Sequence, residues 1–405
     1  MKIWIIDHYS VPVRYYPLAR NTNFAKNLIK MGHEVVIFAA STVHNSEINL
    51  IEGNEQYKEI IDDGVKYVLV KCHQYTGNGI KRILNMQEFA KKLGYVCEKY
   101  EKPDAIISTS MTLHACKKGL QIGRKYGCKT IAQITDLWPE SLIAYGLATK
   151  IHPLVLWYRR IEKWIYKHAD RIVFSMEGAY DYIIEQGWEN EIPKEKVHYI
   201  NNGVDLEQFD YNRNNYQIED ADLRNPDIFK VIYTGSIREV NNIGKLVDIA
   251  KMTKNRKIKY LIWGDGNQRN ELEQRIKNEG IDNIAFKGKV DKKYIPYITS
   301  CADLNIAHNT ASPLFRFGIS FNKIFDYMAA GKPILCDFPC KYNPVIMHSA
   351  GIAVESGKVS DIVETIERME SLREKESLAE NALKAAKYYD FINLAKHLMK
   401  VIESI

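Results

Sequence analysis

Residues 1–40 of the chain read MKIWIIDHYSVPVRYYPLARNTNFAKNLIKMGHEVVIFAA. A short apolar run opens the segment, apolar residues then recur at helical spacing over 24–31, and a second apolar run covers 34–39. Gly32 stands where a glycine commonly ends a helix. The order strand, helix, strand is typical of a βαβ unit, in which a crossover helix joins two parallel strands. The start of the chain therefore predicts a parallel α/β fold.

The same alternation of apolar runs and helical stretches continues along the chain. In the first half, strand candidates begin at Ile3, Val35, Tyr67, Ala105, Thr130, Arg171 and His198. In the second half, they begin near Lys230, Tyr260, Ile284, Leu304, Pro333 and Ile352. The turn-rich segment 201–205 and a polar stretch that ends at Pro226 separate the two sets.

We therefore predict two doubly wound, parallel-sheet α/β domains that face each other across a cleft. Residues 1–200 form the first domain, and residues 201–385 form the second. No strand pattern occurs after residue 371. We expect residues 386–405 to form a C-terminal helix that packs back on the first domain.

Composition narrows the class of protein. The chain has 405 residues, of which 46% are apolar and 26% are charged, and a net charge of +6. So small a basic excess argues against a nucleic-acid partner and suits an anionic membrane or a phosphorylated substrate better. Seven cysteines without a CxxC pair indicate a reducing compartment. Because Asp7 interrupts the first apolar run, we expect neither a signal peptide nor a spanning helix there, and we predict a cytoplasmic location.

Residues 317–335, FGISFNKIFDYMAAGKPIL, carry the most chemical information. Ser320 is expected to cap a short helix that Gly331 ends, and free N–H groups at such a helix start suit a diphosphate. Asp326 lies one turn further along and suits ribose hydroxyls. The alternative is an ordinary amphipathic helix with an ion pair between Lys323 and Asp326.

Open parallel sheets bind ligands beyond the carboxyl ends of their strands. Several polar or glycine-rich positions directly follow predicted strands: His8, the region of His114, Asp136, 235–238 and 264–266. Arg238 follows a Gly-Ser turn, where a guanidinium can bind two phosphate oxygens. The alternative for Arg238 is a surface ion pair, for example with Glu239. The Gly264-Asp265-Gly266 turn lacks the third glycine of GxGxxG, so an ordinary strand-to-helix turn is an equal alternative.

Four segments together resemble glycosyltransferase family 4, whose retaining enzymes have two Rossmann-like domains in the GT-B arrangement. Residues 317–335 resemble the donor-binding motif of the branch that makes capsule, O-antigen and exopolysaccharide sugars. Thr135–Ser141 resemble its DLWPES motif, Asn202–Asp205 its NGVD motif, and Tyr233–Arg238 its glycine turn. Asp326 matches the second acidic residue of the family's E-x7-E motif, whereas the first acidic position is Gly318.

The resemblance implies a retaining transferase that moves a sugar, typically an N-acetylated hexose, from a UDP-sugar to a polyprenyl-linked or glycan acceptor in surface polysaccharide biosynthesis. It implies catalytic roles for His114, Asp136 and Arg238, and acceptor contacts for Arg14 and Glu140. The implied donor-binding residues are Gly235, Ser236, Gly264, Asp265, Lys289, Val290, Ser320, Phe321, Asn322, Lys323 and Asp326.

Each implied role has a plainer alternative. His114 would hydrogen-bond the donor sugar, or it is a surface or capping histidine. Asp136 would orient the acceptor hydroxyl or take its proton, or it caps the following helix, of which Glu140 would be the solvated first turn. Arg14, in the loop 14–20, is otherwise a solvated charge.

A second cation for the diphosphate is less easily found. The family usually has a basic residue five positions after Arg238, and this position is Ile243. Lys245 or Arg316 would have to substitute.

We predict no bound metal and no cofactor besides the nucleotide sugar, since the only DxD, Asp220–Asp222, precedes a strand instead of following one. Residues 151–167 mix tryptophan with arginine and lysine, which suits peripheral contact with an anionic membrane or an ordinary core helix. Two other functions stay open. A sugar-nucleotide epimerase shares the two-domain plan but needs paired carboxylates, and a non-catalytic nucleotide-sugar or glycan-binding partner would tolerate Gly318.

Overall fold

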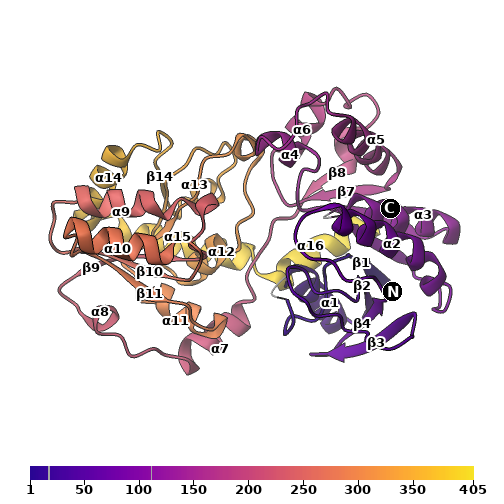
Figure 1. Cartoon of the computed structure of the whole chain (residues 1–405), viewed down its shortest axis with the longest axis horizontal. Coiled ribbons are helices and arrows are strands. Elements are labelled where there is room, and N and C mark those ends of the chain that lie inside the picture. The colour runs from indigo at the N-terminus through magenta and orange to yellow at the C-terminus, as the bar shows by residue number, and fades with distance from the viewer. Residues whose placement is uncertain (17–18, 111) are drawn as a thin grey trace. The chain divides into compact units, whose positions relative to one another are not determined.

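The computed structural model describes residues 1–16, 19–110 and 112–405. The chain forms two compact units, which are shown in Figure 1. Unit 1 comprises Met1–Asn201 and Phe391–Ile405, and unit 2 comprises Asn202–Asp390. Each unit has its own parallel sheet and its own apolar core.

Among the described residues, unit 1 is built on an eight-stranded sheet with the order β3-β4-β2-β1-β5-β6-β7-β8. β3 and β4 pair antiparallel, and the other neighbours pair parallel. Strand β2 is buried at every residue after Glu34, as expected of a parallel strand covered by helices on both faces. The strands are β1 (Lys2–Ile6), β2 (Glu34–Ala40), β3 (Tyr57–Asp62), β4 (Val65–Val70), β5 (Ala105–Thr109), β6 (Lys129–Ile134), β7 (Arg171–Phe174) and β8 (Val197–Tyr199).

One core cluster of unit 1 joins β1, β2, β4 and β5 to two long helices. Trp4 and Ile6 of β1 pack in it with Phe89 and Leu93 of α2 and Ala115 of α3. The helical elements of unit 1 are α1 (Arg20–Lys30), α2 (Ile80–Cys97), α3 (Leu113–Tyr126), α4 (Glu140–Ala144), α5 (Pro153–His168), α6 (Ala179–Glu185), η1 (Lys194–Lys196) and α16 (Phe391–Glu403).

Unit 2, all of whose residues are described, has a six-stranded parallel sheet with the order β11-β10-β9-β12-β13-β14. In β9, Val231 and Tyr233 face one apolar cluster while Ile232 faces another, so both faces of the sheet are covered. The strands are β9 (Phe229–Thr234), β10 (Ile258–Trp263), β11 (Ile284–Gly288), β12 (Leu304–Ala307), β13 (Ile334–Cys336) and β14 (Gly351–Ala353).

Short loops connect these strands to the helices of unit 2. Gly331 ends α12 with a φ of 64°, as the sequence predicted. The helical elements are α7 (Leu206–Asn215), α8 (Ala221–Arg224), η2 (Glu239–Asn241), α9 (Ile243–Met252), α10 (Arg269–Glu279), η3 (Lys292–Tyr294), α11 (Ile295–Ser300), η4 (Pro313–Phe317), α12 (Asn322–Ala329), α13 (Pro344–Met347), α14 (Val359–Ser371) and α15 (Lys375–Tyr388).

The thirteen predicted strand starts each fall within two residues of an observed strand. The sequence reading missed β3, the edge strand that forms a hairpin with β4. Its turn is Asp63-Gly64, and both residues have positive φ values of 50° and 75°. Asp-Gly is a usual signal for the two-residue turn of such a hairpin, so the turn before β4 was detectable.

The boundary at the end of unit 2 lies at residue 390 instead of residue 385. Helix α15 continues to Tyr388 and packs on α12, which keeps these residues in unit 2. Helix α16 then packs on α1, where the Phe24 and Phe391 rings lie 5.5 Å apart. Within the described residues, no helix has both the length and the apolar character needed to cross a membrane.

Candidate active site

The sheet of unit 2 reverses its strand order between β9 and β12, and ligands of doubly wound sheets bind at such a switch point. A cavity of about 610 Å³ opens beyond the carboxyl ends of β9 and β10. Seven of the predicted site residues line it: Gly235, Ser236, Arg238, Gly264, Asp265, Lys289 and Val290. The structure therefore brings together residues that lie as far as 55 positions apart in the sequence (235 to 290).

Two glycine turns form the floor of this cavity by backbone contact. Gly235 N–H donates to Trp263 O at 3.0 Å, and Ile237 N–H donates to Asp265 O at 2.9 Å. A Cβ at Gly264 would collide with Gly235 O, and one at Gly266 would collide with Ile237 O. Because the two chains approach so closely, only glycine fits at these turns.

Arg238 is exposed at the rim of the cavity, immediately before η2. Among the described residues it forms no ion pair, so the alternative of a pair with Glu239 is not found. Its neighbour Ser236 donates from Oγ to Asn241 Oδ1 at 2.7 Å, which holds the turn. The guanidinium therefore remains available for an anion.

Lys323 of α12 lies next to the same turn. Its Nζ donates to Tyr233 Oη at 3.1 Å and lies 4.2 Å from the centre of that ring. A Cβ placed on Gly235 would be 3.1 Å from Lys323 Nζ. Burial lowers the pKa of Lys323 to about 8, against a smaller raising effect of Asp337. Within the described chain it has no ion pair with Asp326, so the ion-pair alternative for this helix is also not found.

The sequence suggested other positions for a second diphosphate cation. Ile243 is fully buried in the apolar core of unit 2. Lys245 Nζ pairs with the buried Asp337 carboxylate at 3.4 Å. Arg316 contacts Pro313 O and lies 4.2 Å from the centre of the Phe317 ring. Of these cations, Lys323 is the one placed at the glycine turn, and its partner Tyr233 could not be identified from the sequence.

The prediction that Ser320 caps α12 was wrong. The helix begins at Asn322, and Phe321 occupies the N-cap position without a side-chain hydrogen bond. Ser320 Oγ instead accepts from Asn202 N–H at 3.2 Å, and Asn202 Nδ2 donates to Ser320 O and Asn322 Oδ1 at 2.9 and 3.1 Å. The serine oxygen is engaged by the NGVD segment, two residues before the helix starts.

Asp326 and Gly318 occupy the two positions of the acidic motif. Asp326 is partly buried, and loss of hydration raises its pKa to about 6 despite the opposing charge of Lys292. Gly318 has a φ of 104°, a conformation that L-residues rarely adopt. An acidic side chain at position 318 would therefore strain this backbone.

The sheet of unit 1 has its own switch point, between β1 and β5. His8 follows β1 and is fully buried, and neither ring nitrogen has a hydrogen-bond partner among the described residues. Burial lowers the pKa of His8 to about 3, so the imidazole is neutral at physiological pH. His114, in the first turn of α3, also lacks described partners for both nitrogens. Its ring lies 5.4 Å from Trp157 and 5.7 Å from Tyr158.

Asp136 follows β6, and its side chain is accessible to solvent. The surrounding protein nevertheless reduces its hydration enough to raise its pKa to about 6. It does not cap α4, because Pro139 holds the N-cap position without a side-chain bond. Glu140 is buried and pairs with Arg159 of α5, so it is not a solvated first-turn residue.

The loop 14–20 is described except for Pro17 and Leu18, which lie outside the described residues. Arg14 pairs with Asp62 at 3.2 Å, although its side chain remains about half exposed. Arg82 of α2 donates from Nε to Tyr9 Oη at 2.9 Å. The sequence does not indicate this contact, because 73 positions separate the two residues.

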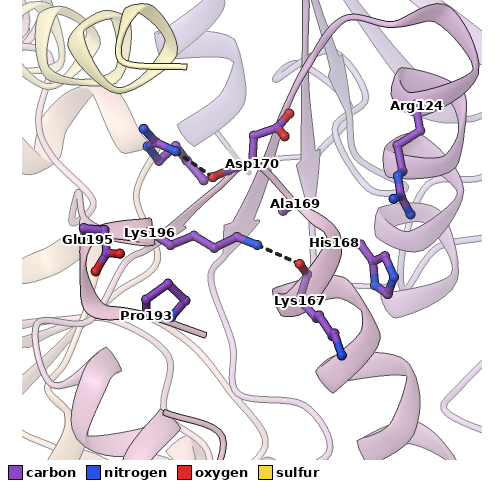
Figure 2. Close-up of a pocket in the computed structure, with 9 residues that line it drawn as sticks. Arg124, Lys167, His168, Ala169, Asp170, Pro193, Glu195 and Lys196 are labelled. Atoms are coloured by element: carbon purple, nitrogen blue, oxygen red, sulfur yellow. Dashed lines mark hydrogen bonds between the residues drawn. The ribbon is translucent and has the colours of Figure 1, made fainter. Parts of the chain in front are cut away.

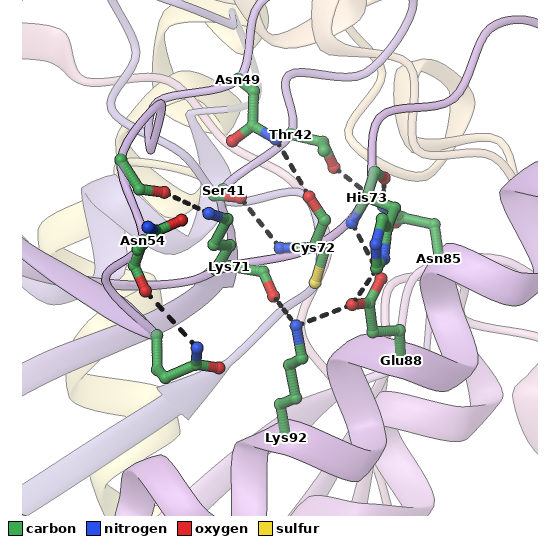
Figure 3. Close-up of polar contacts among 12 residues, drawn as sticks. Ser41, Thr42, Asn49, Asn54, Lys71, Cys72, His73, Asn85, Glu88 and Lys92 are labelled. Carbon is green, nitrogen blue, oxygen red and sulfur yellow. Dashed lines mark hydrogen bonds and ion pairs between the residues drawn. The ribbon is translucent and has the colours of Figure 1, made fainter.

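A polar network fixes the segment that follows β4 (Figure 3). Asn85 Nδ2 donates to His73 O at 2.6 Å and to Thr42 Oγ1 at 3.3 Å. Glu88 accepts from His73 and forms an ion pair with Lys92 at 2.7 Å. Because Thr42 follows β2 and His73 follows β4, the network ties α2 to the carboxyl ends of two strands.

The DxD segment has a structural role. Asp220 accepts from the N–H groups of Asp222 and Leu223 and so caps α8. Both carboxylates pair with Lys287 at 2.7 Å, and Asp222 also pairs with Lys259 at 2.6 Å. In the described ranges, no cluster of His, Cys, Asp and Glu side chains is arranged to hold a metal ion.

Known proteins with related sequences share both halves of this architecture. Residues 20–208 match the model of Glycosyltransferase Family 4, and residues 217–387 match that of Glycosyl transferases group 1. The putative colanic acid biosynthesis glycosyl transferase WcaI of Escherichia coli K12 is 24% identical over 298 residues, which cover 69% of each chain.

Solved structures show the same fold at low identity. Sucrose-phosphate synthase of Thermosynechococcus elongatus superposes with a TM-score of 0.73 at 16% identity, over 100% of this chain and 98% of the other. Anabaena HepE in complex with UDP and glucose has a TM-score of 0.67 at 15% identity, over the whole of both chains. These likenesses establish the GT-B fold. Together with the two family models, which span most of its length, they show that the chain is a glycosyltransferase of family 4.

Proposed function

We propose that this enzyme transfers a sugar, with an N-acetylated hexose as the favoured cargo, from a UDP-sugar to a polyprenyl-linked or glycan acceptor with retention of configuration. The observation that carries the proposal is the cavity of unit 2, which Arg238 lines, with Lys323 beside its Gly235 turn. Among the described residues, neither cation has a carboxylate partner. The Anabaena HepE structures contain UDP, and WcaI is named for colanic acid biosynthesis, which supports a nucleotide donor and a polysaccharide pathway.

In this proposal the diphosphate lies against the Gly235 turn. Arg238 binds two of its oxygens as a planar fork, and Lys323 supplies a point charge from α12. As the bond to the sugar breaks, negative charge grows on the leaving diphosphate, and two fixed cations stabilise it without reorganisation. These cations would do the work of a metal ion, so we propose a metal-independent reaction.

The nucleoside would bind further along the same cavity. The backbone at Lys289 and Val290, which line it, is suited to reading the edge of the base, and the Gly264 turn allows close approach. Asp326 would accept hydrogen bonds from ribose hydroxyls, a role that needs its ionised form.

Unit 1 would provide the acceptor chemistry. A neutral His114, whose ring nitrogens have no partner among the described residues, can donate to or accept from a sugar hydroxyl. Asp136, with its raised pKa, is basic enough to take a proton from an acceptor hydroxyl near neutral pH. Arg14 and Glu140 remain candidates for acceptor contacts, although each already has an ion-pair partner.

Membrane contact is proposed for the segment that begins α5. Its inner face is core, with Val155, Ile161 and Ile165 buried, but Ile151 and Trp157 are exposed. Exposed apolar side chains beside lysine and arginine suit the interface of an anionic bilayer. Co-sedimentation with phosphatidylglycerol vesicles should weaken in Ile151→Ser and not in Ile61→Ser, an exposed isoleucine on β3.

The reaction itself is tested by incubating the enzyme with UDP-sugars, with and without a membrane extract. Release of UDP that depends on the extract, with radiolabelled sugar appearing in the lipid or glycan fraction, is expected. Free sugar without acceptor would point to an epimerase-type reaction. Binding of UDP-sugar without any turnover would contradict the proposed transfer and favour a binding role.

A further inference from the structure

A second cavity, of about 430 Å³, opens in unit 1 at the amino ends of two sheet strands, β7 and β8 (Figure 2). Arg171 is the first residue of β7, and Lys196 directly precedes β8, so the cavity lies at the amino ends of these strands. His114 and Asp136 follow the carboxyl ends of β5 and β6. The cavity is therefore separate from the candidate active site.

The lining of this cavity is rich in cations. Arg124, Lys167, Arg171 and Lys196 contribute four positive charges, against two carboxylates from Asp170 and Glu195. Asp170 is already engaged, since its carboxylate accepts from Thr130 N–H at 2.8 Å and from Thr130 Oγ1 at 2.7 Å. Lys167 pairs with Glu191 at 2.8 Å, outside the lining.

The other three cations have no carboxylate partner. Within the described ranges, Arg124, Arg171 and Lys196 form no ion pair. Figure 2 shows Arg124 and Lys196 on opposite sides of the cavity. Unpaired cations around one concavity are costly to hold together, because each repels the others.

Basic residues often gather at helix carboxyl ends, where they complement the helix dipole. The dipole of α5 explains in part why Lys196 lies at the end of that helix. Its Nζ donates to Lys167 O at 2.7 Å, while His168 Nδ1 bonds Trp164 O at 2.7 Å and Ala169 N–H bonds Ile165 O at 3.0 Å. Three of the last carbonyls of α5, those of Trp164, Ile165 and Lys167, are thus satisfied without the two arginines.

The hydrogen bonds of the arginines are to neutral groups. Arg171 donates from Nε to Ser404 Oγ at 3.2 Å, from Nη2 to Ser404 O at 2.6 Å and from Nη1 to Asp170 O at 3.0 Å. The side chain of Arg124 has no hydrogen bond among the described residues. Burial, together with repulsion from Arg171 and Arg124, lowers the pKa of Lys196 against the raising effect of Asp170. A bound dianion would relieve this repulsion.

We propose that the cavity lined by Arg124, Arg171 and Lys196 binds a phosphate group. Two guanidinium groups and an ammonium that line one cavity match the charge and the hydrogen-bonding needs of a phosphate monoester. The phosphate belongs either to a free phosphorylated molecule or to a lipid headgroup, and both offer the same chemistry to these side chains.

The test uses two double variants of the full-length enzyme that remove equal charge. R124Q/K196Q removes two cavity cations, and K125Q/K194Q removes their sequence neighbours at the same helix end and in the same η1 segment, outside the lining. Isothermal titration with inorganic phosphate at constant ionic strength measures the free form. Any phosphate bound in the donor cavity contributes equally to the parent and to both variants.

R124Q/K196Q is expected to weaken phosphate binding by about a hundredfold or more, since two charge-assisted hydrogen bonds are lost. K125Q/K194Q should bind like the parent.

Phosphatidylcholine vesicles with and without phosphatidic acid test the lipid form. If only vesicle binding falls in R124Q/K196Q, the phosphate is that of a headgroup. Equal losses in both double variants, or no loss in R124Q/K196Q with either probe, would overturn the proposal. Unchanged circular dichroism confirms that each variant folds.

Discussion

The two cations beside the Gly235 turn, Arg238 and Lys323, differ in their exposure to solvent and therefore in the pH range over which they are charged. Arg238 is exposed, and a guanidinium stays charged at any physiological pH. Lys323 is partly buried against Tyr233, and burial lowers its pKa to about 8. An exposed and a desolvated cation at one turn should therefore contribute differently to donor binding and to its dependence on pH.

Replacement of Arg238 by alanine removes a charge that we assign to the leaving diphosphate. Loss of one charge-assisted hydrogen bond costs about 1.5–3 kcal/mol, so kcat/KM for the donor should fall about ten- to a hundredfold. Lys257→Ala, an exposed lysine before β10, is the matched control and should leave kcat/KM unchanged. Steady-state kinetics with a UDP-sugar checks this, and equal activity in both variants would remove Arg238 from the site.

The pH dependence of donor use should report on Lys323. With a pKa of about 8 in the free enzyme, its charge is present below pH 8 and lost as the pH rises above it. We therefore expect kcat/KM for the donor to decline above pH 8. In Lys323→Arg the decline should disappear, because arginine remains protonated. A decline of the same shape in Lys323→Arg would assign it to another group.

Asp136 should set the acidic limit of turnover. Its pKa is raised to about 6 by loss of hydration, so the basic carboxylate form prevails above pH 6 and is lost below it. We expect kcat/KM for the acceptor to fall as the pH drops through 6, and Asp136→Asn to be slow at every pH with that acidic limb removed. An unchanged acidic limb in Asp136→Asn would exclude this carboxylate as the base.

Single residues differ in how far the sequence determines their surroundings. The glycine turns and Arg238 were predictable because strand ends of a parallel sheet meet at one edge. The contact of Lys323 with Tyr233 and the ion pair of Glu140 with Arg159 were not, because they join positions 90 and 19 residues apart through tertiary packing. Neither partner stands in a sequence pattern that would identify it.

At the scale of elements, buried parallel strands were predicted well because both faces are covered, which gives continuous apolar runs. The missed strand β3 has only partly buried or exposed residues and no buried position, so it lacks an apolar run. The start of α12 was also misplaced. Ser320 has the chemistry of a cap, but its oxygen is used by Asn202. Local preference therefore yielded to a tertiary hydrogen bond.

The contact between the two glycine turns predicts a specific effect of added side-chain volume. A methyl group at Gly264 would collide with Gly235 O and displace the Gly235 turn. Gly127→Ala is a suitable control, since Gly127 has a φ of 67° and a methyl group there would meet no atom within 4 Å. This control should cost only the left-handed strain of about 1–2 kcal/mol.

We expect Gly264→Ala to lose more unfolding free energy than Gly127→Ala and to weaken UDP binding, which Gly127→Ala should not affect. Denaturant unfolding and calorimetric titration with UDP provide the two measurements. If UDP binding survives in Gly264→Ala, the close approach of the two turns does not serve the donor.

At the scale of the molecule, unit 1 is not continuous in sequence. The chain leaves it at Asn201 and returns at Phe391, so α16, which packs on α1, belongs to the unit that begins with β1. The sequence predicted a terminal helix, because the tail has no strand pattern. It could not place the boundary, since α15 and α16 are both amphipathic and only Tyr389 and Asp390 separate them.

This arrangement predicts that damage to the chain terminus affects unit 1 and spares donor binding. Leu398 of α16 is 1% exposed, so Leu398→Ala should cost about 2–5 kcal/mol of the unfolding free energy of unit 1. Lys396→Ala, on the exposed face of the same helix, should cost little. Hydrogen exchange would show faster exchange in unit 1, while UDP titration should give the parent affinity because the donor cavity lies wholly in unit 2. Loss of UDP affinity in Leu398→Ala, or equal destabilisation of unit 2, would mean that the two units do not fold as separate cores.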